Sequence, residues 1–439
     1  MGLIPGKWTI KSSCSMHLWA SMLPLMLIVP LVFRSVLLSS EKPGNLIIGQ
    51  SGGATAVINA SLVGAVEAAF TDRRIGAVYG MLHGIEGLLK EQLIDLRQQP
   101  VGIWQQLLHT PSAALGSCRY KLHDHDLEHT IEILRRYDIC YMLYIGGNDS
   151  ADTAHRLAET AQQMSYDLSI LSIPKTIDND LPFTDHCPGY GSAARFIAQA
   201  TQDSALNTIS IPWHYPVKII ETMGRDAGWL TASSALGKRD ESDPPHILLI
   251  PEQPFIADRF LAQVEDVYKK LGYVIVVTAE TIKNEKGQAL GSLGQVGVDA
   301  FQHPLLSGAA QYLVDLVKSE LKLRARFDKP GDLQRMSSAH ISSTDRDEAY
   351  LVGKMGVHAL LDGENDKMVT LIRHDELTYH CITGLAELDK VANVQRLLPD
   401  EYLNRDKTMV TPPFYDYALP LIGESLSHHT RLDMSKVRQ

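Results

Sequence analysis

Three short apolar runs in this chain each end in residues that favour a ligand-binding loop. Two of them, Leu46–Gly49 and Ile139–Ile145, lead through glycine pairs into helical patterns, one from about Ala54 to Ala69 and one ending at Gln163. Glycine pairs at such junctions let backbone N–H groups approach an anion at a helix N-terminus, although a single pair is more often a plain tight turn. The repeated junction predicts an α/β fold that binds phosphate.

Strands and helices are expected to alternate along most of the chain. The runs with strand composition are Asn45–Gly49, Cys140–Ile145, Leu168–Ile173, Val217–Thr222, His246–Ile250 and Tyr273–Ala279. Amphipathic helices are expected between them, such as Gly189–Leu206 and Phe255–Leu271. This alternation predicts a doubly wound α/β fold. A chain of 439 residues, 45% of them hydrophobic, is large enough for more than one domain.

The third apolar run, Leu168–Ile173, is followed by Pro174-Lys175-Thr176-Ile177-Asp178-Asn179-Asp180. In an open α/β sheet, residues at the carboxyl end of a strand lie where ligands bind. The lysine can neutralise phosphate oxygens, one aspartate can accept a proton from an attacking hydroxyl, and another can hold Mg²⁺. A solvated acidic turn is the alternative for this run taken alone. Together with the two glycine-rich junctions, the run predicts phosphoryl transfer.

From about Asn45 to the C-terminal region, the chain resembles the phosphofructokinase family. The matching pieces, in family order, are Ser51-Gly52-Gly53, Leu115-Gly116-Ser117-Cys118-Arg119, Gly146-Gly147-Asn148-Asp149-Ser150, Lys175-Thr176-Ile177-Asp178-Asn179-Asp180, Glu221-Thr222-Met223-Gly224-Arg225, Pro251-Glu252 and Leu333-Gln334-Arg335. The resemblance implies two doubly wound α/β domains with the active site in the cleft between them. It places a donor-binding domain at 44–188, completed by 340–439, and a fructose 6-phosphate-binding domain at 189–339.

The resemblance also implies roles for single residues. Asp178 resembles the base that accepts the proton of the sugar 1-hydroxyl, and Lys175 and Arg119 resemble further catalytic residues near the transferred group. The donor-binding positions are Gly53, Asp149 and Lys175. The positions that hold the sugar phosphate are Thr176, Met223, Gly224, Arg225, Glu252, Arg326 and Arg335. The implied cofactor is Mg²⁺, near Asn148, Asp149 and Asp180.

Two positions in this pattern indicate the phosphoryl donor. Family members that use ATP have glycine at the position of Asp149, where a carboxylate adds bulk and repels an α-phosphate. They also have glycine at the position of Lys175, a cation suited to pyrophosphate. The resemblance therefore implies reversible transfer from pyrophosphate to the 1-hydroxyl of fructose 6-phosphate, which gives fructose 1,6-bisphosphate and phosphate. The alternatives are an ATP-dependent phosphofructokinase and a noncatalytic regulatory subunit that binds a sugar phosphate.

Three residues depart from the family pattern. Asn148 replaces an aspartate that usually binds Mg²⁺ or its waters, and an amide oxygen is a weaker ligand than a carboxylate. Asp332 replaces a His or Tyr that contacts the sugar phosphate, and its charge is unfavourable there unless it faces an arginine of the phosphate clamp. Pro216 replaces an arginine that in many relatives reaches the 6-phosphate in a neighbouring subunit, with Lys218 and His214 as possible substitutes.

Composition limits the partners and the compartment. The formal net charge of -10 argues against nonspecific nucleic-acid binding. The cysteines show no metal spacing and no disulfide framework, which favours a reducing compartment; they are Cys14, Cys118, Cys140, Cys187 and Cys381. With the glycolytic substrates that the resemblance implies, we expect a cytoplasmic enzyme that binds small molecules. A homo-oligomer, either a dimer or a tetramer, is also expected, and no membrane is expected for the catalytic part.

The first 43 residues do not match this pattern. Lys7 and Lys11 precede an apolar run, Leu18–Phe33, which resembles a signal peptide or a short anchor. The run is shorter than the roughly 18 to 20 residues of a spanning helix, and its prolines weaken a helix. Real targeting and an upstream-extended start, with the working protein beginning near Glu41, are both open readings. A core helix is less favoured because the first family strand begins at Asn45.

Overall fold

The computed structural model describes residues 43–290, 308–374, 378–430 and 432. These described residues belong to one compact unit. The expectation for the leader, and Cys14 with it, lies outside the described residues. Within the described ranges, every helix is too short or too polar to cross a membrane.

A larger sheet of seven strands contains both glycine-rich junctions. Its order is β13-β12-β5-β4-β1-β2-β3, and the five strands from β12 to β2 are parallel neighbours, while β13 and β3 pair antiparallel at the edges. The strands are β1 (Gly44–Gln50), β2 (Ile75–Met81), β3 (Leu93–Asp95), β4 (Ile139–Gly146), β5 (Ser169–Pro174), β12 (Lys367–His374) and β13 (His380–Glu387). Because β1, β4 and β5 are parallel, their carboxyl ends meet at one edge of the sheet.

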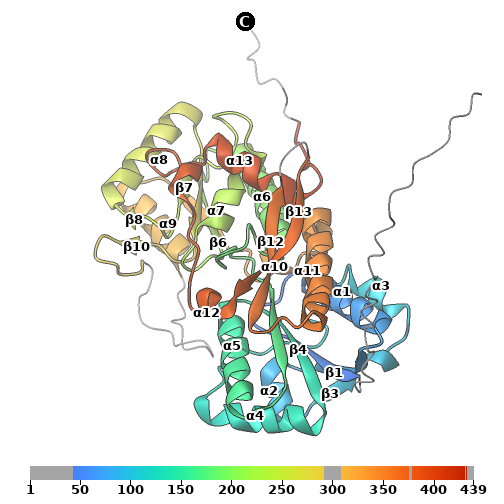
Figure 1. The fold of residues 1–439 in the computed structure, drawn as a ribbon. Helices are drawn as coiled ribbons and strands as arrows, with labels where there is room; N and C mark the ends of the chain where they lie inside the picture. The colour runs from blue at the N-terminus through green and yellow to red at the C-terminus, as the bar shows by residue number, and fades with distance from the viewer. Residues whose placement is uncertain (1–42, 291–307, 375–377, 431, 433–439) are drawn as a thin grey trace, which may run out of the picture. The chain divides into compact units, whose positions relative to one another are not determined.

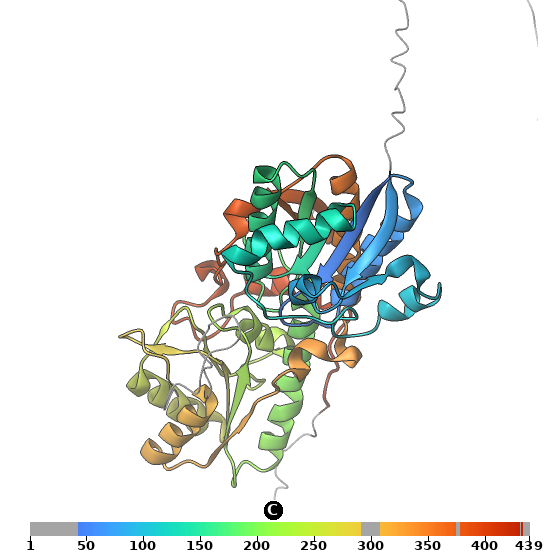
Figure 2. The same ribbon diagram turned by 90° about the horizontal axis from the view of Figure 1, so that it is seen from below.

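Helices cover both faces of this sheet (Figures 1 and 2). Successive residues of a strand point to opposite faces, so Leu46 and Ile48 pack toward α1 and α11 while Ile47 packs toward α2, α4 and α5. The helices of this part are α1 (Ile58–Thr71), α2 (Gly84–Leu89), α3 (Ile103–Leu107), α4 (Asp124–Arg136), α5 (Asn148–Gln163), α11 (Ser343–Leu361) and α12 (Leu388–Val391). Strands buried on both faces explain the continuous apolar runs in the sequence.

A smaller sheet of four parallel strands has the order β11-β6-β9-β7. Its strands are β6 (Val217–Thr222), β7 (Ile247–Leu249), β9 (Val274–Ala279) and β11 (Ala325–Asp328), and a separate two-stranded ribbon pairs β8 (Pro254–Phe255) with β10 (Lys283–Asn284). The helices around it are α6 (Tyr190–Ser210), α7 (Trp229–Ser233), α8 (Ala257–Leu271), α9 (Ala309–Glu320), α10 (Leu333–Met336) and α13 (Pro412–Ala418). The predicted bounds of β6 are confirmed, β9 differs from its prediction by one residue at one end, and the other predicted strands differ by one residue at both ends.

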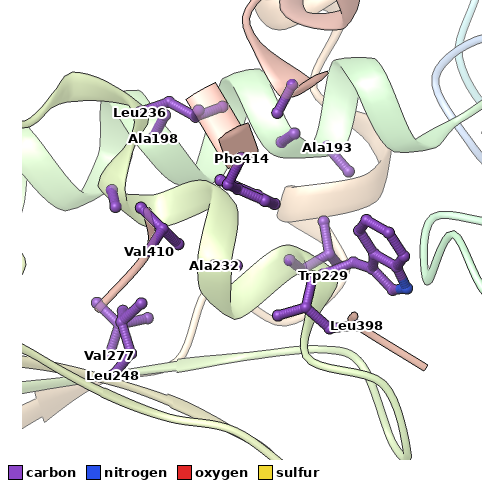
Figure 3. Close-up of a cluster of buried hydrophobic side chains, with 14 of the residues drawn as sticks. Ala193, Ala198, Trp229, Ala232, Leu236, Leu248, Val277, Leu398, Val410 and Phe414 are labelled. Carbon is purple, nitrogen blue, oxygen red and sulfur yellow. The ribbon is translucent and has the colours of Figure 1, made fainter. Parts of the chain in front are cut away.

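The C-terminal segment returns to the smaller sheet. Figure 3 shows Phe414 of α13 among alanines of α6 and α7, in a cluster that also contains Leu398 and Val277. The predicted assignment of all of 340–439 to the first domain differs from the observed packing in its second half: α11, β12, β13 and α12 pack with the larger sheet, while residues between Leu398 and Leu426 pack beside the smaller one. The donor and sugar-phosphate roles of the two parts stay predictions.

The first predicted helix starts later than expected. α1 begins at Ile58 rather than near Ala54, because Thr55 bonds outside a helical pattern: its carbonyl accepts the N–H of Ser112 at 3.1 Å and its Oγ1 accepts the N–H of Val57 at 3.4 Å, so residues 51–57 form a loop. Ser51 donates its N–H to the Ile145 carbonyl at 2.9 Å, and Gly52 donates to Cys118 at 3.1 Å with a left-handed φ of 75°. The loop is thus fixed at the sheet edge where β4 ends.

Candidate active site

A cavity of about 600 Å³ lies at the carboxyl ends of strands from both sheets. Its walls come from the loops that follow β1, β4, β5, β6 and β9. Eleven of the fourteen predicted site residues line it: Gly53, Arg119, Asn148, Asp149, Lys175, Thr176, Asp178, Asp180, Met223, Arg225 and Arg335. The structure therefore brings together most of the residues that the motifs singled out, from segments far apart in the sequence.

Lys175 lies in the floor of this cavity, directly after β5. Only 3% of the residue is exposed, and its Nζ donates to the Gly53 carbonyl at 2.8 Å. Burial lowers the pKa of Lys175 to about 8, and the charges of Arg335 and Arg119 act in the same direction. A buried ammonium group beside two arginines makes this end of the cavity suited to an anion of high charge.

The turn after Lys175 is fixed by its own side chains. Thr176 Oγ1 accepts the N–H of Asp178 at 3.1 Å. Asn179 has a φ of 55°, and its buried amide donates to the Tyr417 hydroxyl at 2.8 Å and accepts the N–H of Cys187 at 2.9 Å. A non-glycine residue in the left-handed region needs such support. The two aspartates on either side of Asn179 are thereby held at the cavity wall.

Asp178 has the environment expected of a general base. Its Oδ1 is buried with no hydrogen-bond partner among the described residues. Burial raises the pKa of Asp178, and the neighbouring carboxylates of Asp180 and Glu280 raise it further. Burial also raises the pKa of Asp180, against the hydrogen bond from Thr176. A substrate hydroxyl placed against Asp178 would supply the missing partner and the proton to be removed.

Arg335 lines the cavity next to the loop that carries Gly53. Its Nη2 pairs with Asp332 Oδ1 at 2.7 Å, so the unusual aspartate does face the clamp arginine. A Cβ added to Gly53 would lie 2.6 Å from Arg335 Nη1, so the Arg335 guanidinium lies directly against the donor loop. Arg335 Nε is buried and has no partner among the described residues, so its N–H can donate to a ligand in the cavity.

The loop after β6 supplies the other sugar-side residues. Met223 donates its N–H to Gln334 Oε1 at 2.9 Å, which ties this loop to α10. Gly224 does not line the cavity, but it has a φ of 112°, and a Cβ added to it would lie 2.7 Å from the Ala227 carbonyl oxygen, so the turn requires glycine. Gly224 therefore shapes the loop that presents Met223 and Arg225.

Besides Gly224, two predicted sugar-phosphate residues do not line the cavity. Glu252 Oε1 accepts the N–H groups of Gly228 at 2.8 Å and Leu398 at 3.0 Å, so this oxygen joins two loops. Arg326 is exposed on β11, with its guanidinium 3.2 Å from the ring centroid of Tyr215. Glu252 Oε2 is buried with no partner among the described residues, so contact of Glu252 with the sugar phosphate stays a prediction, and Arg326 does not line the cavity of its own chain.

Glu280 is a cavity residue that the motifs missed. It directly follows β9, lines the cavity, and lies close enough to Asp178 to raise the pKa of that carboxyl. Burial raises the pKa of Glu280 itself, against the positive charge of Arg225 and Lys329. The available signal was the predicted strand Tyr273–Ala279, because the polar residue after a parallel strand belongs at the ligand edge.

The carboxylates in the cavity suit a hard cation. Asp149 in the first turn of α5 and Asp180 in the turn after β5 both line it together with Asp178, whose Oδ1 is buried without a partner among the described residues. Oxygen ligands of this kind fit Mg²⁺. The prediction that Asn148 is a ligand conflicts with the structure: its Nδ2 donates to the Val394 carbonyl at 2.7 Å, and its Oδ1 accepts the N–H of Asn393.

Lys218 and His214 are the suggested substitutes for the family arginine that Pro216 replaces, and the structure leaves only one of them at the surface. Lys218 is buried and its Nζ bonds both carboxylate oxygens of Asp328 at 2.9 Å, so it cannot reach a phosphate outside its own fold. His214 is exposed in the turn before β6. Only His214 remains available at the surface.

A second cluster of ionisable groups lies away from the cavity. His186, Glu348 and Cys381 have ligand atoms within 4.8 Å of one another. Both imidazole nitrogens of His186 already contact carboxylates, with Asp185 at 2.9 Å and Glu348 at 2.6 Å. Although burial disfavours the imidazolium, Glu348 and Asp185 outweigh it and raise the pKa of His186 to about 9. Both ring nitrogens of His186 are therefore occupied in a buried ion network with carboxylates.

Comparison with known proteins places this arrangement in a family. The family model described as phosphofructokinase matches residues 45–360. A pyrophosphate–fructose 6-phosphate 1-phosphotransferase from Halomonas elongata is 40% identical over 385 residues, which cover 86% of this chain and 91% of that protein. Crystal structures of pyrophosphate-dependent phosphofructokinases from Nitrosospira multiformis and Marinobacter aquaeolei both superpose with a TM-score of 0.79.

The sequence identity with this chain is 35% for the Nitrosospira structure and 37% for the Marinobacter structure. Each match covers 90% of this chain, and the matches cover 95% and 98% of those two chains. The predicted phosphofructokinase-like α/β fold is confirmed by their similarity. The family model covers well over half of the chain, and the relative matches nearly end to end. The chain therefore belongs to the phosphofructokinase family.

Proposed function

We propose that this protein transfers a phosphoryl group from pyrophosphate to the 1-hydroxyl of fructose 6-phosphate. The observation that carries the proposal is the pair Asp149 and Lys175 at the donor end of the cavity. Asp149 occupies the space that an α-phosphate would need and repels its charge, while buried Lys175 supplies a cation for a compact, highly charged anion. Pyrophosphate has no nucleoside to place, so both features favour it over ATP.

The acceptor end of the cavity fits the sugar phosphate. Met223 and Arg225 follow β6, and Arg335 presents a guanidinium whose planar donors match phosphate oxygens. Asp178, in its ionised form, would accept the proton of the 1-hydroxyl as that oxygen attacks phosphorus, because a raised pKa makes the carboxylate a stronger proton acceptor. Arg119 and Lys175 would counter the charge of the group in flight.

Mg²⁺ is the cofactor that these residues would hold. Asp149 and Asp180 would bind it, and the ion would neutralise part of the charge of pyrophosphate. The reaction would be reversible, because the bond broken in pyrophosphate and the ester formed are closer in energy than with ATP as donor. The exposed position of Arg326 leaves it available to another subunit of a homo-oligomer, which is the assembly we expect.

A donor assay tests the proposal. Purified protein would be mixed with fructose 6-phosphate, Mg²⁺ and either pyrophosphate or ATP, and formation of fructose 1,6-bisphosphate would be followed. We expect turnover with pyrophosphate and a much slower rate with ATP. A preference for ATP would favour the ATP-dependent enzyme. Sugar-phosphate binding without turnover of either donor would favour the regulatory subunit.

A further inference from the structure

The segment Asn393–Arg396, here called the strap, closes one side of the cavity. It follows α12, which packs against α5 (Figure 1). At its start, the strap is tied to the first turns of α5: Asn148 Nδ2 donates to the Val394 carbonyl at 2.7 Å, and Asn393 Nδ2 donates to Asp152 Oδ1 at 2.9 Å. Asn393 and Gln395 line the cavity. The strap therefore borders the donor site directly.

At its other end, the strap is tied to the turn that carries the aspartates. The N–H of Arg396 donates to the Asp180 carbonyl at 2.7 Å. Its guanidinium donates through Nη2 to the Asn179 carbonyl at 2.9 Å and through Nη1 to the Thr184 carbonyl at 2.8 Å, with a further bond to the Asp185 carbonyl. One side chain thus joins both ends of the loop 179–185.

The chemistry of this contact requires an arginine. Several carbonyl and hydroxyl acceptors are reached from different sides, which a planar fork of donors can do and a single ammonium group cannot. The guanidinium also lies 4.6 Å from the ring centroid of Trp229, whose indole Nε1 donates to the Arg396 carbonyl at 3.1 Å. Figure 3 shows Trp229 beside Leu398, where the chain after the strap enters the core. Both ends of the strap are therefore anchored.

We propose that Arg396 is a positioning residue for phosphoryl transfer. Through the strap it links the turn of Asp178 and Asp180 to the first turn of α5, so that the base and the donor site keep one spacing. The inference rests on the proposed function. A group held through backbone carbonyls controls the geometry of attack, and a misplacement of about 1 Å can cost about 10²-fold in rate.

The test uses variants that separate positioning from stability. Arg396→Lys keeps the charge and loses the fork, so kcat should fall about 10- to 100-fold with both KM values within about twofold. Arg396→Ala should lose at least as much, and millimolar guanidinium should restore part of its kcat while equal sodium chloride should not. The thermal melt of each variant is recorded alongside.

Arg373→Lys is the matched control. Arg373 is also partly buried, pairs with Asp185 at 3.1 Å, donates to the Tyr417 carbonyl at 2.8 Å, and lies over aromatic rings. Its replacement should lower the melting temperature yet leave kcat within about twofold, without a guanidinium effect. If the Arg396 variants do not fold, Asn148→Ala, which releases the far end of the strap, should show the same selective loss of kcat.

The outcomes separate this inference from the proposed function. Wild-type protein that turns over neither donor would overturn both. If the wild type is active and the folded Arg396→Lys variant keeps a normal kcat, or changes only in KM, the positioning role alone would be overturned. An equal loss of kcat in Arg373→Lys would also overturn it, because general loosening would then explain the effect. A selective loss of kcat with guanidinium rescue would support it.

Discussion

Replacing Lys175 with methionine should change stability and activity in opposite directions. Burial lowers the pKa of Lys175 from its usual 10.5 to about 8. One pKa unit corresponds to about 1.4 kcal/mol, so keeping this lysine charged in the folded protein at pH 7 costs on the order of 3 kcal/mol. Methionine has a similar length and no charge, so the variant removes this cost.

The net gain at pH 7 is smaller than that figure. Lys175 Nζ donates to the Gly53 carbonyl at 2.8 Å, and leaving a buried acceptor without its donor costs about 1–3 kcal/mol. We therefore expect the free energy of unfolding at pH 7 to rise by roughly 0–2 kcal/mol. Lost function with gained stability is a common result at active sites.

The change of this stability difference with pH does not depend on the cost of the unpaired Gly53 carbonyl. Because the folded pKa of Lys175 lies below the unfolded value, the penalty is complete below pH 8 and disappears as the pH rises from 8 to 10.5. Over that window the wild type should gain about 3 kcal/mol of stability relative to Lys175→Met. The activity should fall about 10- to 100-fold in kcat/KM for pyrophosphate, the effect of losing one charged hydrogen bond of about 1.5–3 kcal/mol.

Urea unfolding at pH 7, 8, 9 and 10, with a chelator and without substrates, measures the stability difference. Lys218→Met is the control, because that buried lysine is paired with Asp328 at 2.9 Å and its loss should only destabilise. If the difference in unfolding free energy between Lys175→Met and wild type stays constant across this pH range, the lowered pKa of buried Lys175 would be refuted. Unchanged turnover of pyrophosphate would refute its place in the donor site.

Three further predictions concern the base, the donor and the distant ion network. Asp178→Ala should lower kcat by about 10²- to 10⁴-fold, as for a lost general base; a variant with more than about half of wild-type activity in the same assay would contradict the assignment. Asp149→Gly combined with Lys175→Gly should raise the ratio of ATP to pyrophosphate initial rates, since it opens the space for an α-phosphate and removes the charge that pyrophosphate needs; no increase in that ratio would mean that these positions do not select the donor. Because the folded pKa of His186, about 9, lies above the unfolded value, its stabilisation is complete below pH 6.5 and is lost as the pH rises to 9. Over this range, the free energy of unfolding of the wild type should therefore fall by about 3 kcal/mol relative to that of His186→Gln, as measured by urea unfolding. Parallel dependence of the two unfolding free energies on pH would show that His186 is not held protonated in the network.

The sequence alone determined the parts of this protein whose signals are local. An apolar run followed by glycine specifies a buried parallel strand and a turn, since both depend on neighbouring residues and on the period of burial. Because parallel strands end at one edge, the residues after β1, β4 and β5 could be predicted to share a site, and Gly53, Asp149, Lys175 and Asp178 do line one cavity. The same rule would have found Glu280.

Only the tertiary structure decided which of several plausible side chains face that cavity. Glu252 stands in a matching motif but does not line the cavity, and Asn148 lines it with its amide already engaged: Glu252 Oε1 and Asn148 Nδ2 bond to Leu398 and Val394, which come from a segment more than 140 residues further along the chain. Arg396 meets Asn179 across 217 positions. Such contacts depend on how the C-terminal segment docks against both sheets, and no local pattern of residues encodes that docking.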